Sequence, residues 1–236
     1  MNNYIVRRNN RIYRKALKRE MAIWERSARE LNPANEVANK EETISENNPI
    51  LLKYFNKKLG IKNKSEFGWV DFIVNNYEPV QTSLSLGSGS EKFEKAFLER
   101  GFTKNFNTID IVSIEGPNNY DNDLNFIKFE NNKYDFILCK SILHHIINLE
   151  YLLYQVNSAL KENGILVVYE YIGENKQQWA DKKIEIINKS IHKYIGKYPF
   201  LKIKKPLMKN IIPFESIRSY DIQRVLKNYF GNNIDY

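Results

Sequence analysis

The sequence predicts an α/β fold with a doubly wound, mostly parallel sheet and an additional helix at the N-terminus. Between residues 83 and 169, short apolar runs alternate with amphipathic segments, which is the pattern of βαβ units. A turn with two glycines, Gly87 and Gly89, follows the first apolar run and leads into a helical pattern. Because crossovers between parallel strands are right-handed, this order of elements predicts helices on both faces of the sheet.

Helices are expected before the sheet. They are predicted over residues 3–31, 49–60 and 67–77. Pro33 ends the first helix, and Asn48 is a typical N-cap for the second. The residues between these two helices are polar and predict a linker. We therefore divide the chain into an N-terminal basic helix and linker, residues 1–48, and a main domain, residues 49–236.

The sheet itself is expected from five apolar runs. Strands are predicted at residues 83–86, 106–112, 124–129, 134–139 and 165–169, with connecting helices at 91–100 and 145–162. The run from Tyr134 to Cys139 is almost continuously apolar, as in a parallel strand buried on both faces. After Tyr171 the alternation ends. Two more helices are predicted there, at 174–197 and 215–230, on either side of an irregular segment with prolines at 198–213.

The composition is typical of a globular protein without a membrane span. Of the 236 residues, 42% are hydrophobic and 27% are charged, and no apolar run approaches the length that crosses a bilayer. The N-terminus is rich in Asn and Arg and lacks the apolar segment of a secretory signal. The single cysteine, Cys139, cannot form an internal disulfide, which fits a reducing compartment. We therefore expect a cytoplasmic protein.

The net charge of +8 is concentrated in two segments. Residues 1–20 contain seven Arg or Lys and one acidic residue, and residues 176–209 contain ten Lys and two acidic residues. The rest of the chain is acidic overall, so no specific nucleic-acid partner is expected. The first basic segment could lie on an acidic surface or join two copies of the chain into an oligomer, and its pattern does not decide between these alternatives.

The turn of Gly87, Ser88 and Gly89 is the most informative motif. Glycines let a backbone approach a ligand closely, and the start of the following helix offers unpaired N–H groups. Asp110 lies about twenty residues further on, at the end of the next strand, where a carboxylate can accept hydrogen bonds from both ribose hydroxyls. The combination predicts an adenosine-containing cofactor. The alternatives are a plain strand-to-helix turn and a carboxylate that caps a helix.

The spacing around this turn argues against nucleotide cofactors that are held by their phosphates. The dinucleotide motif requires a third small residue three positions after Gly89, where this chain has Lys92. The G-x-x-x-x-G-K-S/T motif of a P-loop is absent. S-adenosylmethionine has no phosphates and tolerates a shorter glycine loop, so we expect it to be the cofactor.

Several segments together resemble the class I S-adenosylmethionine-dependent methyltransferases, over roughly residues 80–172. They are the glycine turn, Asp110, the block from Tyr134 through Leu143-His144-His145-Ile146, and Leu160-Lys161-Glu162-Asn163-Gly164 before Ile165. The resemblance implies a Rossmann-like sheet. Further segments are similar to a bacterial subgroup associated with surface-glycan biosynthesis, namely Glu170-Tyr171-Ile172-Gly173, Gln178-Trp179 and Phe214-Glu215-Ser216-Ile217-Arg218-Ser219.

The chain departs from this family at some cofactor positions. Ser85 stands where the family usually has an acidic residue in the first strand. The acidic residue that contacts adenine has no clean counterpart, and Glu130 is the nearest candidate. We also assign Ser141, after the strand at 134–139, to the cofactor site. The family's last pair of strands would lie beyond Tyr236. These departures leave open a methyltransferase-like scaffold that has lost its cofactor.

His144, His145 and Glu170 are the candidate catalytic residues, because they follow predicted strands at the edge of the sheet where ligands bind. A histidine, with an ordinary pKa of about 6.5, can take a proton from an acceptor hydroxyl. The alternatives are a packed histidine, a helix-capping histidine and a surface carboxylate. No metal is expected, because the sequence places no third ligand near the two histidines.

The candidate acceptor-binding residues are Tyr171, Gln178, Trp179 and Arg218. Arg218 could clamp a phosphate or carboxylate, or it could pair with Glu215 on the same helix. Together with the lysines nearby, these residues predict an anionic acceptor and an acceptor-site insertion at residues 174–214.

The predicted reaction is O-methylation of a sugar, a nucleotide sugar or another small anionic acceptor. A protein or nucleic-acid methyltransferase is the enzymatic alternative. Enzymes that methylate amino groups of nucleic acids usually have an Asn/Asp-Pro-Pro-aromatic turn after the fourth strand. This chain has Lys140-Ser141-Ile142-Leu143 there, which disfavours that alternative.

Overall fold

The computed structural model confirms the α/β, Rossmann-like fold. It describes residues 6–30, 53, 56–61, 66–112, 120–177, 180–194 and 212–231. Within these residues the sheet has four strands, all parallel, in the order β2-β1-β3-β4. They are β1 (Ser83–Leu86), β2 (Phe106–Ile109), β3 (Tyr134–Lys140) and β4 (Leu160–Tyr169). No helix in this part of the chain combines the length and the apolar character needed to cross a bilayer.

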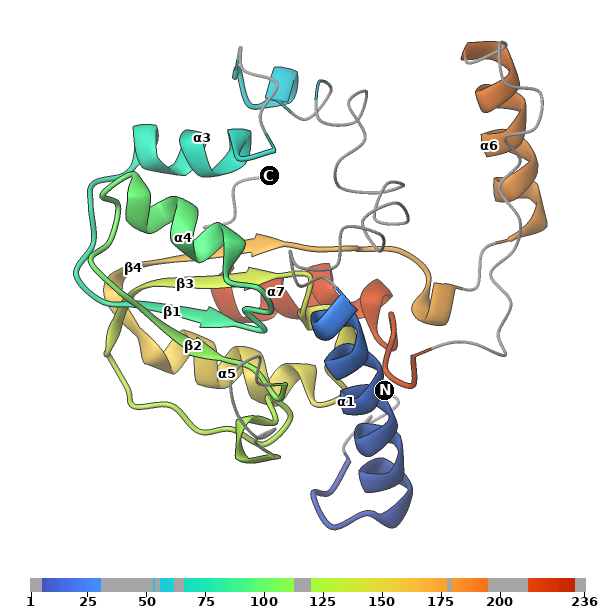
Figure 1. Cartoon of the computed structure of the whole chain (residues 1–236), viewed down its shortest axis with the longest axis horizontal. Coiled ribbons are helices and arrows are strands. Elements are labelled where there is room, and N and C mark those ends of the chain that lie inside the picture. The colour runs from blue at the N-terminus through green and yellow to red at the C-terminus, as the bar shows by residue number, and fades with distance from the viewer. Residues whose placement is uncertain are drawn as a thin grey trace.

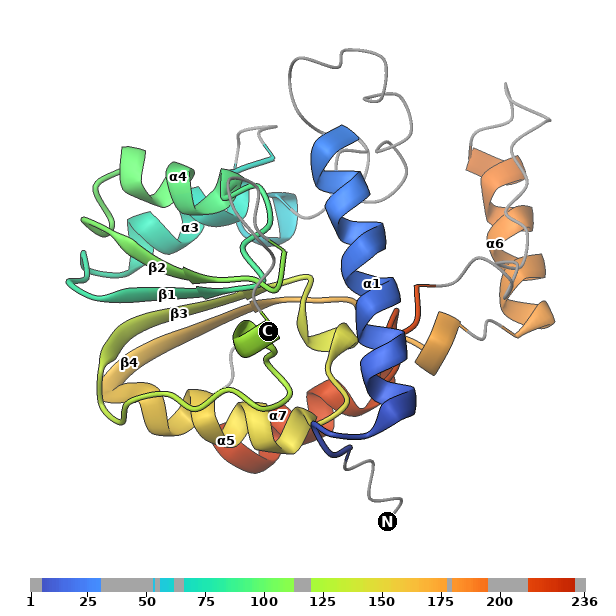
Figure 2. The same cartoon turned by 60° about the horizontal axis from the view of Figure 1, so that its bottom comes forward.

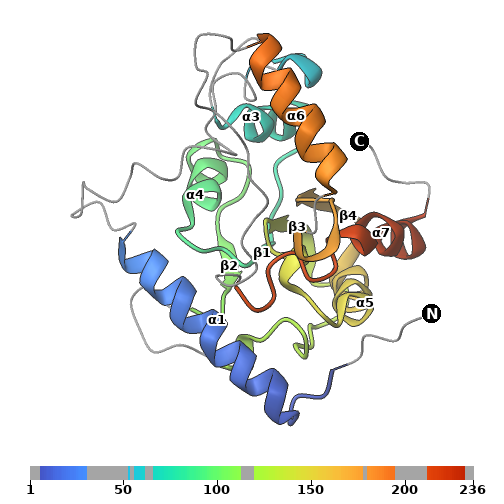
Figure 3. The same cartoon turned by 90° about the vertical axis from the view of Figure 1, so that its right-hand side faces the viewer.

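Helices surround the sheet on both faces and at the carboxyl ends of its strands. They are α1 (Arg11–Glu30), α3 (Gly68–Asn76), α4 (Lys92–Glu99), α5 (Leu149–Ala159), α6 (Asp181–Tyr194) and α7 (Ile222–Phe230). Helices α3 and α4 cover one face, and α5 and α7 cover the other (Figure 1). Helix α1 crosses the carboxyl ends of the strands, and α6 stands further out on the same side (Figure 2). Viewed end-on, α1 and α6 lie on opposite sides of the strand ends (Figure 3).

The strand order places a topological switch point at the carboxyl ends of β1 and β3. From β1 the chain passes through α4 to β2 on one side, and from β3 it passes through α5 to β4 on the other. The chain therefore changes direction between β1 and β3, and open α/β sheets bind their ligands outside the carboxyl ends at such a switch point. The glycine turn follows β1 and the histidine pair follows β3, so both predicted motifs lie at this point.

The predicted strand at residues 124–129 is wrong. These residues form a turn and an extended segment that pairs with no other strand. The Asp123 carboxylate accepts a hydrogen bond from the backbone N–H of Asn125, and the Asp123 carbonyl accepts one from Phe126. The apolar side chains of Leu124 and Phe129 are nevertheless buried. The apolar pattern of this segment correctly indicated that its side chains are buried. Its backbone, however, bonds to nearby side chains instead of forming the hydrogen-bond ladder of a sheet.

Four predicted helices begin several residues later than expected, and one of them is α6, which begins at Asp181 rather than at residue 174. Helix α1 begins at Arg11 because the Asn10 side chain accepts hydrogen bonds from the N–H groups of Ile12 and Tyr13. Helix α5 begins at Leu149, after a separate short 3₁₀ turn at 143–145. Helix α7 begins at Ile222, after turns at 213–218 and a 3₁₀ turn at Ser219–Asp221, and the N–H of Ile217 in this stretch donates to the His144 carbonyl. The predicted linker and the irregular segment at 198–213 lie outside the described residues, except for residues 212 and 213.

Helix α1 is packed onto the domain through one face. Tyr13, Leu17 and Met21 are buried with Phe214 in a cluster at the carboxyl end of the sheet. Tyr13 also donates a 2.6 Å hydrogen bond to the buried Asp123 carboxylate. The apolar stripe of α1 is thus used inside the chain, and its basic residues line the outer side.

Asp135 joins the starts of three strands. Its Oδ2 accepts hydrogen bonds from the N–H and the hydroxyl of Thr82, and its Oδ1 accepts one from Lys161 Nζ at 2.8 Å. Partial burial alone would raise the pKa of Asp135, but these hydrogen bonds lower it to about 2. Because the folded pKa lies below the unfolded value, the stabilisation is present above about pH 4 and is lost as pH falls towards 2.

We expect Asp135→Asn to lower the free energy of unfolding by about 1–2 kcal/mol at pH 7, since part of the interaction is screened by solvent. Urea denaturation at pH 7 and pH 3 should show that the difference in free energy of unfolding between wild type and variant is smaller at pH 3. Asp121→Asn is the control, because its side chain is 84% exposed and its loss should cost under about 0.5 kcal/mol. If this difference in free energy of unfolding were equal at both pH values, the charge of the Asp135 carboxylate would not be the source of the stabilisation.

Candidate active site

The glycine turn and Asp110 meet at the edge of the sheet. Gly87 and Gly89 have φ values of +67° and +53°, which glycine adopts without strain. The Asp110 carboxylate points at the turn, because its Oδ2 accepts a 3.0 Å hydrogen bond from the N–H of Gly89. Its Oδ1 accepts a 2.9 Å hydrogen bond from the N–H of Val112. The predicted pairing of turn and carboxylate is therefore present in the structure.

Asp110 fits the role of a ribose ligand. Burial raises its pKa, and backbone hydrogen bonds and the nearby charge of His145 lower it, with burial the larger effect. Each carboxylate oxygen has a second lone pair that can accept a ribose hydroxyl. A Cβ atom at Gly89 would meet no atom within 4 Å, so the turn borders open space at Gly89, whereas at Gly87 it packs against Ile142. These residues fit an adenosine cofactor such as S-adenosylmethionine.

A carboxylate also reaches Ser85, although the strand carries none. The Ser85 hydroxyl donates a short hydrogen bond to Glu94, a buried residue of α4. Burial raises the pKa of the Glu94 carboxyl. Glu94 was not among the residues predicted from the sequence; its signal there is an acidic residue on the inward side of a helix whose other buried residues, Ala96 and Phe97, are apolar.

The two histidines are held by two buried carboxylates. The His144 Nδ1 lies 2.7 Å from Glu170 Oε2, and the His145 Nδ1 lies 2.7 Å from Glu20 Oε1. Since an ionised carboxylate only accepts hydrogen bonds, each Nδ1 carries the proton and each Nε2 has a lone pair in the neutral ring. Burial alone would lower the pKa of His144, but the hydrogen bond and charge of Glu170 and the charges of Glu215 and Glu20 raise it overall.

Glu170 organises the loop after β3. Besides His144, its carboxylate accepts hydrogen bonds from the backbone N–H groups of Ile142, Leu143 and Tyr171. With so many donors around it, this buried side chain is better suited to orient His144 than to take a proton from an acceptor.

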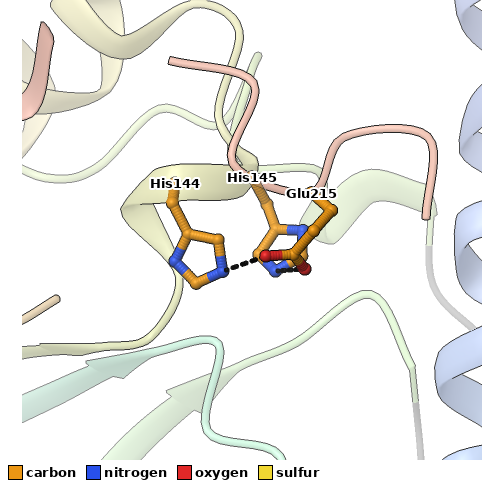
Figure 4. A group of neighbouring side chains, drawn as sticks. All are labelled: His144, His145 and Glu215. Carbon is orange, nitrogen blue, oxygen red and sulfur yellow. Dashed lines mark ion pairs between the residues drawn. The ribbon is translucent and has the colours of Figure 1, made fainter. Parts of the chain in front are cut away.

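Segments from both ends of the chain complete this cluster. Glu20 of α1 is 2% exposed and also accepts a 2.8 Å hydrogen bond from the N–H of Phe214. The next residue, Glu215, faces both histidines (Figure 4). The backbone is fixed there because Ile217 N–H donates to the carbonyl of His144. Glu20 was not predicted from the sequence, where it is an acidic residue in line with the buried stripe of Tyr13, Leu17 and Met21 of a basic helix.

The structure leaves some predicted site residues elsewhere. Glu130 precedes β3, so it lies at the opposite edge of the sheet from the glycine turn, and it pairs with Lys133. Arg218 is buried and binds Glu150, not Glu215. Ser141 lies directly after β3 with φ +52°, within the switch point. Tyr171 is half-buried beside Glu170. Gln178 and Trp179 lie outside the described residues.

Residues 50–200 match the family described as a methyltransferase domain. No curated protein matches the chain in sequence. Solved structures with a similar arrangement include an S-adenosylmethionine-dependent methyltransferase from Mesorhizobium loti, at 20% identity over 44% of this chain and 55% of that one, with a TM-score of 0.35. Another is a methyltransferase from Aquifex aeolicus, at 14% identity over 61% and 86%, with a TM-score of 0.36.

Phosphoethanolamine N-methyltransferase 2 from Haemonchus contortus is a third, at 15% identity over 75% of this chain and 40% of that one, with a TM-score of 0.42. The chain spans between 55% and 57% of the length of several other solved structures that it matches, such as YcgJ from Bacillus subtilis. At these TM-scores, the family assignment depends on the sequence match of residues 50–200.

Proposed function

The chain belongs to the methyltransferase-domain family, whose cofactor is S-adenosylmethionine, and from this premise we propose that it methylates a hydroxyl group of a small anionic acceptor. The observation that carries the proposal is the hydrogen bond between Gly89 and Asp110 at the switch point of the sheet. It joins the two groups that an adenosine cofactor requires, and the histidine pair lies in the next loop along the same edge.

The residues at the turn would hold the cofactor. Asp110 would accept hydrogen bonds from the ribose hydroxyls, and the backbone of Gly87, Ser88 and Gly89 would line the ligand closely. When bound, S-adenosylmethionine supplies a methyl group on a positively charged sulfur, which leaves as a neutral thioether. The protein therefore has to align the acceptor oxygen with that methyl group and exclude water.

The histidine pair would activate the acceptor hydroxyl. The proton of the hydroxyl passes to a histidine Nε2 while the new C–O bond forms and the C–S bond breaks. Glu170 and Glu20 hold the Nδ1 protons of His144 and His145, so they fix the tautomer that makes each Nε2 basic. Glu170 is thus a positioning residue in this proposal, and the two histidines are the catalytic candidates.

The acceptor class is inferred from the segment at residues 174–214, which we propose as the acceptor-site insertion of the domain at 49–236. Its helix α6 stands beyond the carboxyl ends of the strands (Figure 2). Its lysines favour an anion, although Lys183 and Lys189 form ion pairs with Glu174 and Glu185. The resemblance of Glu170–Gly173 to enzymes of surface-glycan biosynthesis supports a sugar or nucleotide sugar. A cytoplasmic location is part of the proposal.

Asp110→Ala is expected to weaken S-adenosylmethionine binding about 10- to 100-fold, because two hydrogen bonds to a charged group are lost. Isothermal titration of wild type and variant with S-adenosylmethionine and its demethylated product measures this loss. Asp121→Ala is the control at an exposed carboxylate and should bind as wild type does. If wild type bound neither compound, the enzymatic proposal would fail and the scaffold alternative would gain support.

The acceptor is tested by incubating the full chain with nucleotide sugars, phosphorylated sugars and neutral sugars, with S-adenosylmethionine present. We expect a mass increase of one methyl group on an anionic sugar and none on its neutral counterpart. Methylation of added RNA or of a protein, with no sugar product, would replace the proposed acceptor class.

A further inference from the structure

His144, His145 and Glu215 form a compact cluster of possible metal ligands. One ligand atom from each side chain lies within 4.8 Å of the other two. The His144 Nε2 is 3.6 Å from Glu215 Oε1, and the His145 Nε2 is 3.6 Å from Glu215 Oε2. Both imidazoles point the Nε2 side at the same carboxylate (Figure 4). The side chains are 9%, 10% and 20% exposed, so the cluster is largely enclosed by protein.

The three groups face each other as hydrogen-bond acceptors. Both Nδ1 atoms are engaged with Glu170 and Glu20, which leaves a lone pair on each Nε2. The Nε2–oxygen distances of 3.6 Å are too long for good hydrogen bonds. With both rings neutral, two lone pairs and a carboxylate at this spacing are balanced by a positive charge, either a proton on an imidazole or a cation between the three groups. Glu215 Oε1 also accepts a 3.0 Å hydrogen bond from the Ser216 hydroxyl, which leaves a second lone pair on that oxygen.

We propose that His144, His145 and Glu215 bind a divalent transition-metal cation, with Zn²⁺ or a similar ion as the ligand. Two imidazole nitrogens and one carboxylate are a common protein ligand set for Zn²⁺ and its neighbours. With metal–ligand bonds of about 2.0–2.2 Å, tetrahedral ligands lie roughly 3.4 Å apart. The two Nε2–oxygen separations of 3.6 Å are close to that value, and all three ligand atoms lie within 4.8 Å of one another. The side chains would therefore have to move closer together to bring one atom from each onto a single ion.

The surroundings of the histidines are those of metal-binding histidines. Such residues almost always donate the other ring N–H to a carboxylate or carbonyl, which fixes the ring and raises its basicity. Here both histidines do so, and the carboxylates of Glu170 and Glu20 are each 2% exposed. The backbone holds the third ligand in place, because the N–H of Ile217, two residues after Glu215, donates to the His144 carbonyl.

Three protein ligands leave a coordination position for an oxygen of the acceptor. This role depends on the proposed methyl transfer, in which the bound cation would lower the pKa of the acceptor hydroxyl so that the proton leaves more easily. In that case the cation, and not the Nε2 atom of a histidine without a bound metal, would activate the acceptor hydroxyl. Binding of the cation itself does not depend on the methyl-transfer proposal.

The test is metal binding by the full chain without an affinity tag, after removal of metals with EDTA and without S-adenosylmethionine or acceptor. Titration with Co²⁺ should give one equivalent of a species with intense visible absorption, typical of four or five ligands, and Zn²⁺ should displace it. Glu215→Gln should weaken binding about 100-fold or more, and Glu20→Gln about 10- to 100-fold. Glu174→Gln, an acidic residue paired with Lys183 on α6, should bind as wild type does.

The proposal is overturned if wild type shows no such Co²⁺ spectrum, or if the Glu215→Gln variant binds as tightly as wild type. The first outcome would mean that a protonated histidine, not a metal ion, supplies the positive charge next to the Glu215 carboxylate. If Glu215→Gln did not fold, the spectrum and stoichiometry of wild type would still decide. Failure of metal binding with normal S-adenosylmethionine binding would refute this site alone, and the reverse result would refute the methyltransferase proposal alone.

Discussion

Arg218→Met is expected to lower the free energy of unfolding by about 2–4 kcal/mol. The guanidinium is 3% exposed and binds both carboxylate oxygens of Glu150, with the shorter N–O distance at 2.5 Å. It also donates to Asp221 at 3.0 Å and to the carbonyl of Ile147 at 3.0 Å. Methionine keeps the apolar stem but removes the donor of the Ile147 carbonyl and one of the donors of Asp221, which is 17% exposed. Glu150 is 47% exposed and can be hydrated, so most of the expected cost is that of leaving buried acceptors without a hydrogen bond. Urea denaturation measures the loss.

Arg224→Met is the matched control. Arg224 also pairs with Asp221, at 3.1 Å, but its side chain is 57% exposed, so its loss should cost under about 0.5 kcal/mol. If Arg218→Met left stability unchanged and raised the KM for the acceptor, the structural role would be refuted and the acceptor clamp considered from the sequence would be supported.

Gly87→Ala is expected to destabilise the fold by about 2–4 kcal/mol and to weaken cofactor binding. A residue with a side chain at φ +67° costs about 1 kcal/mol. A Cβ atom there would also lie 2.6 Å from Cγ1 and 2.9 Å from Cβ of Ile142, so the loop after β3 would have to shift. Overpacking of this kind typically costs 1–3 kcal/mol. Thermal or urea unfolding, with titration of S-adenosylmethionine, measures both effects.

Gly89→Ala separates the backbone cost of a positive φ from the cost of overpacking against Ile142. Its φ is +53°, but an added Cβ would meet nothing within 4 Å, so only the backbone cost of about 1 kcal/mol is expected. Combining Gly87→Ala with Ile142→Ala should show a favourable coupling energy of about 1 kcal/mol or more in a double-mutant cycle. Additive effects of the two substitutions would mean that contact with Ile142 is not the source of the cost.

The strands of the sheet were largely predictable because each contains apolar residues between turn signals. The signal is clearest in β3, where most residues are buried and the run is nearly continuously apolar, whereas β1 alternates Ser and Leu and β2 is half exposed. The segment at 124–129 shows the limit of that signal. Burial makes a segment apolar whether its backbone bonds to a neighbouring strand or to side chains, and here Asp123 and Gln155 supply the partners.

The site was predictable only where it is local in sequence. The glycine turn and Asp110 belong to one βαβ unit, and the histidines follow a recognisable strand. Glu20 and Glu215 were not assigned, because their contacts with His145 span 125 residues in the first case and depend on how the C-terminal segment folds back in the second. The sequence left Arg218 either as a clamp for the acceptor or as a partner of Glu215 one helical turn away. In the structure Arg218 pairs with Glu150, and α7 begins only at Ile222.

Glu20 and Glu215 also lie on either side of the stretch, residues 50–200, that the family match covers, whereas both histidines lie inside it. A fragment cut to that stretch would keep the turn for the methyl donor and both imidazole rings, but it would lose the carboxylates that orient one ring and face the other. In the proposed reaction, the residues that act on the acceptor are therefore completed by two segments that lie outside the matched stretch, one near each end of the chain.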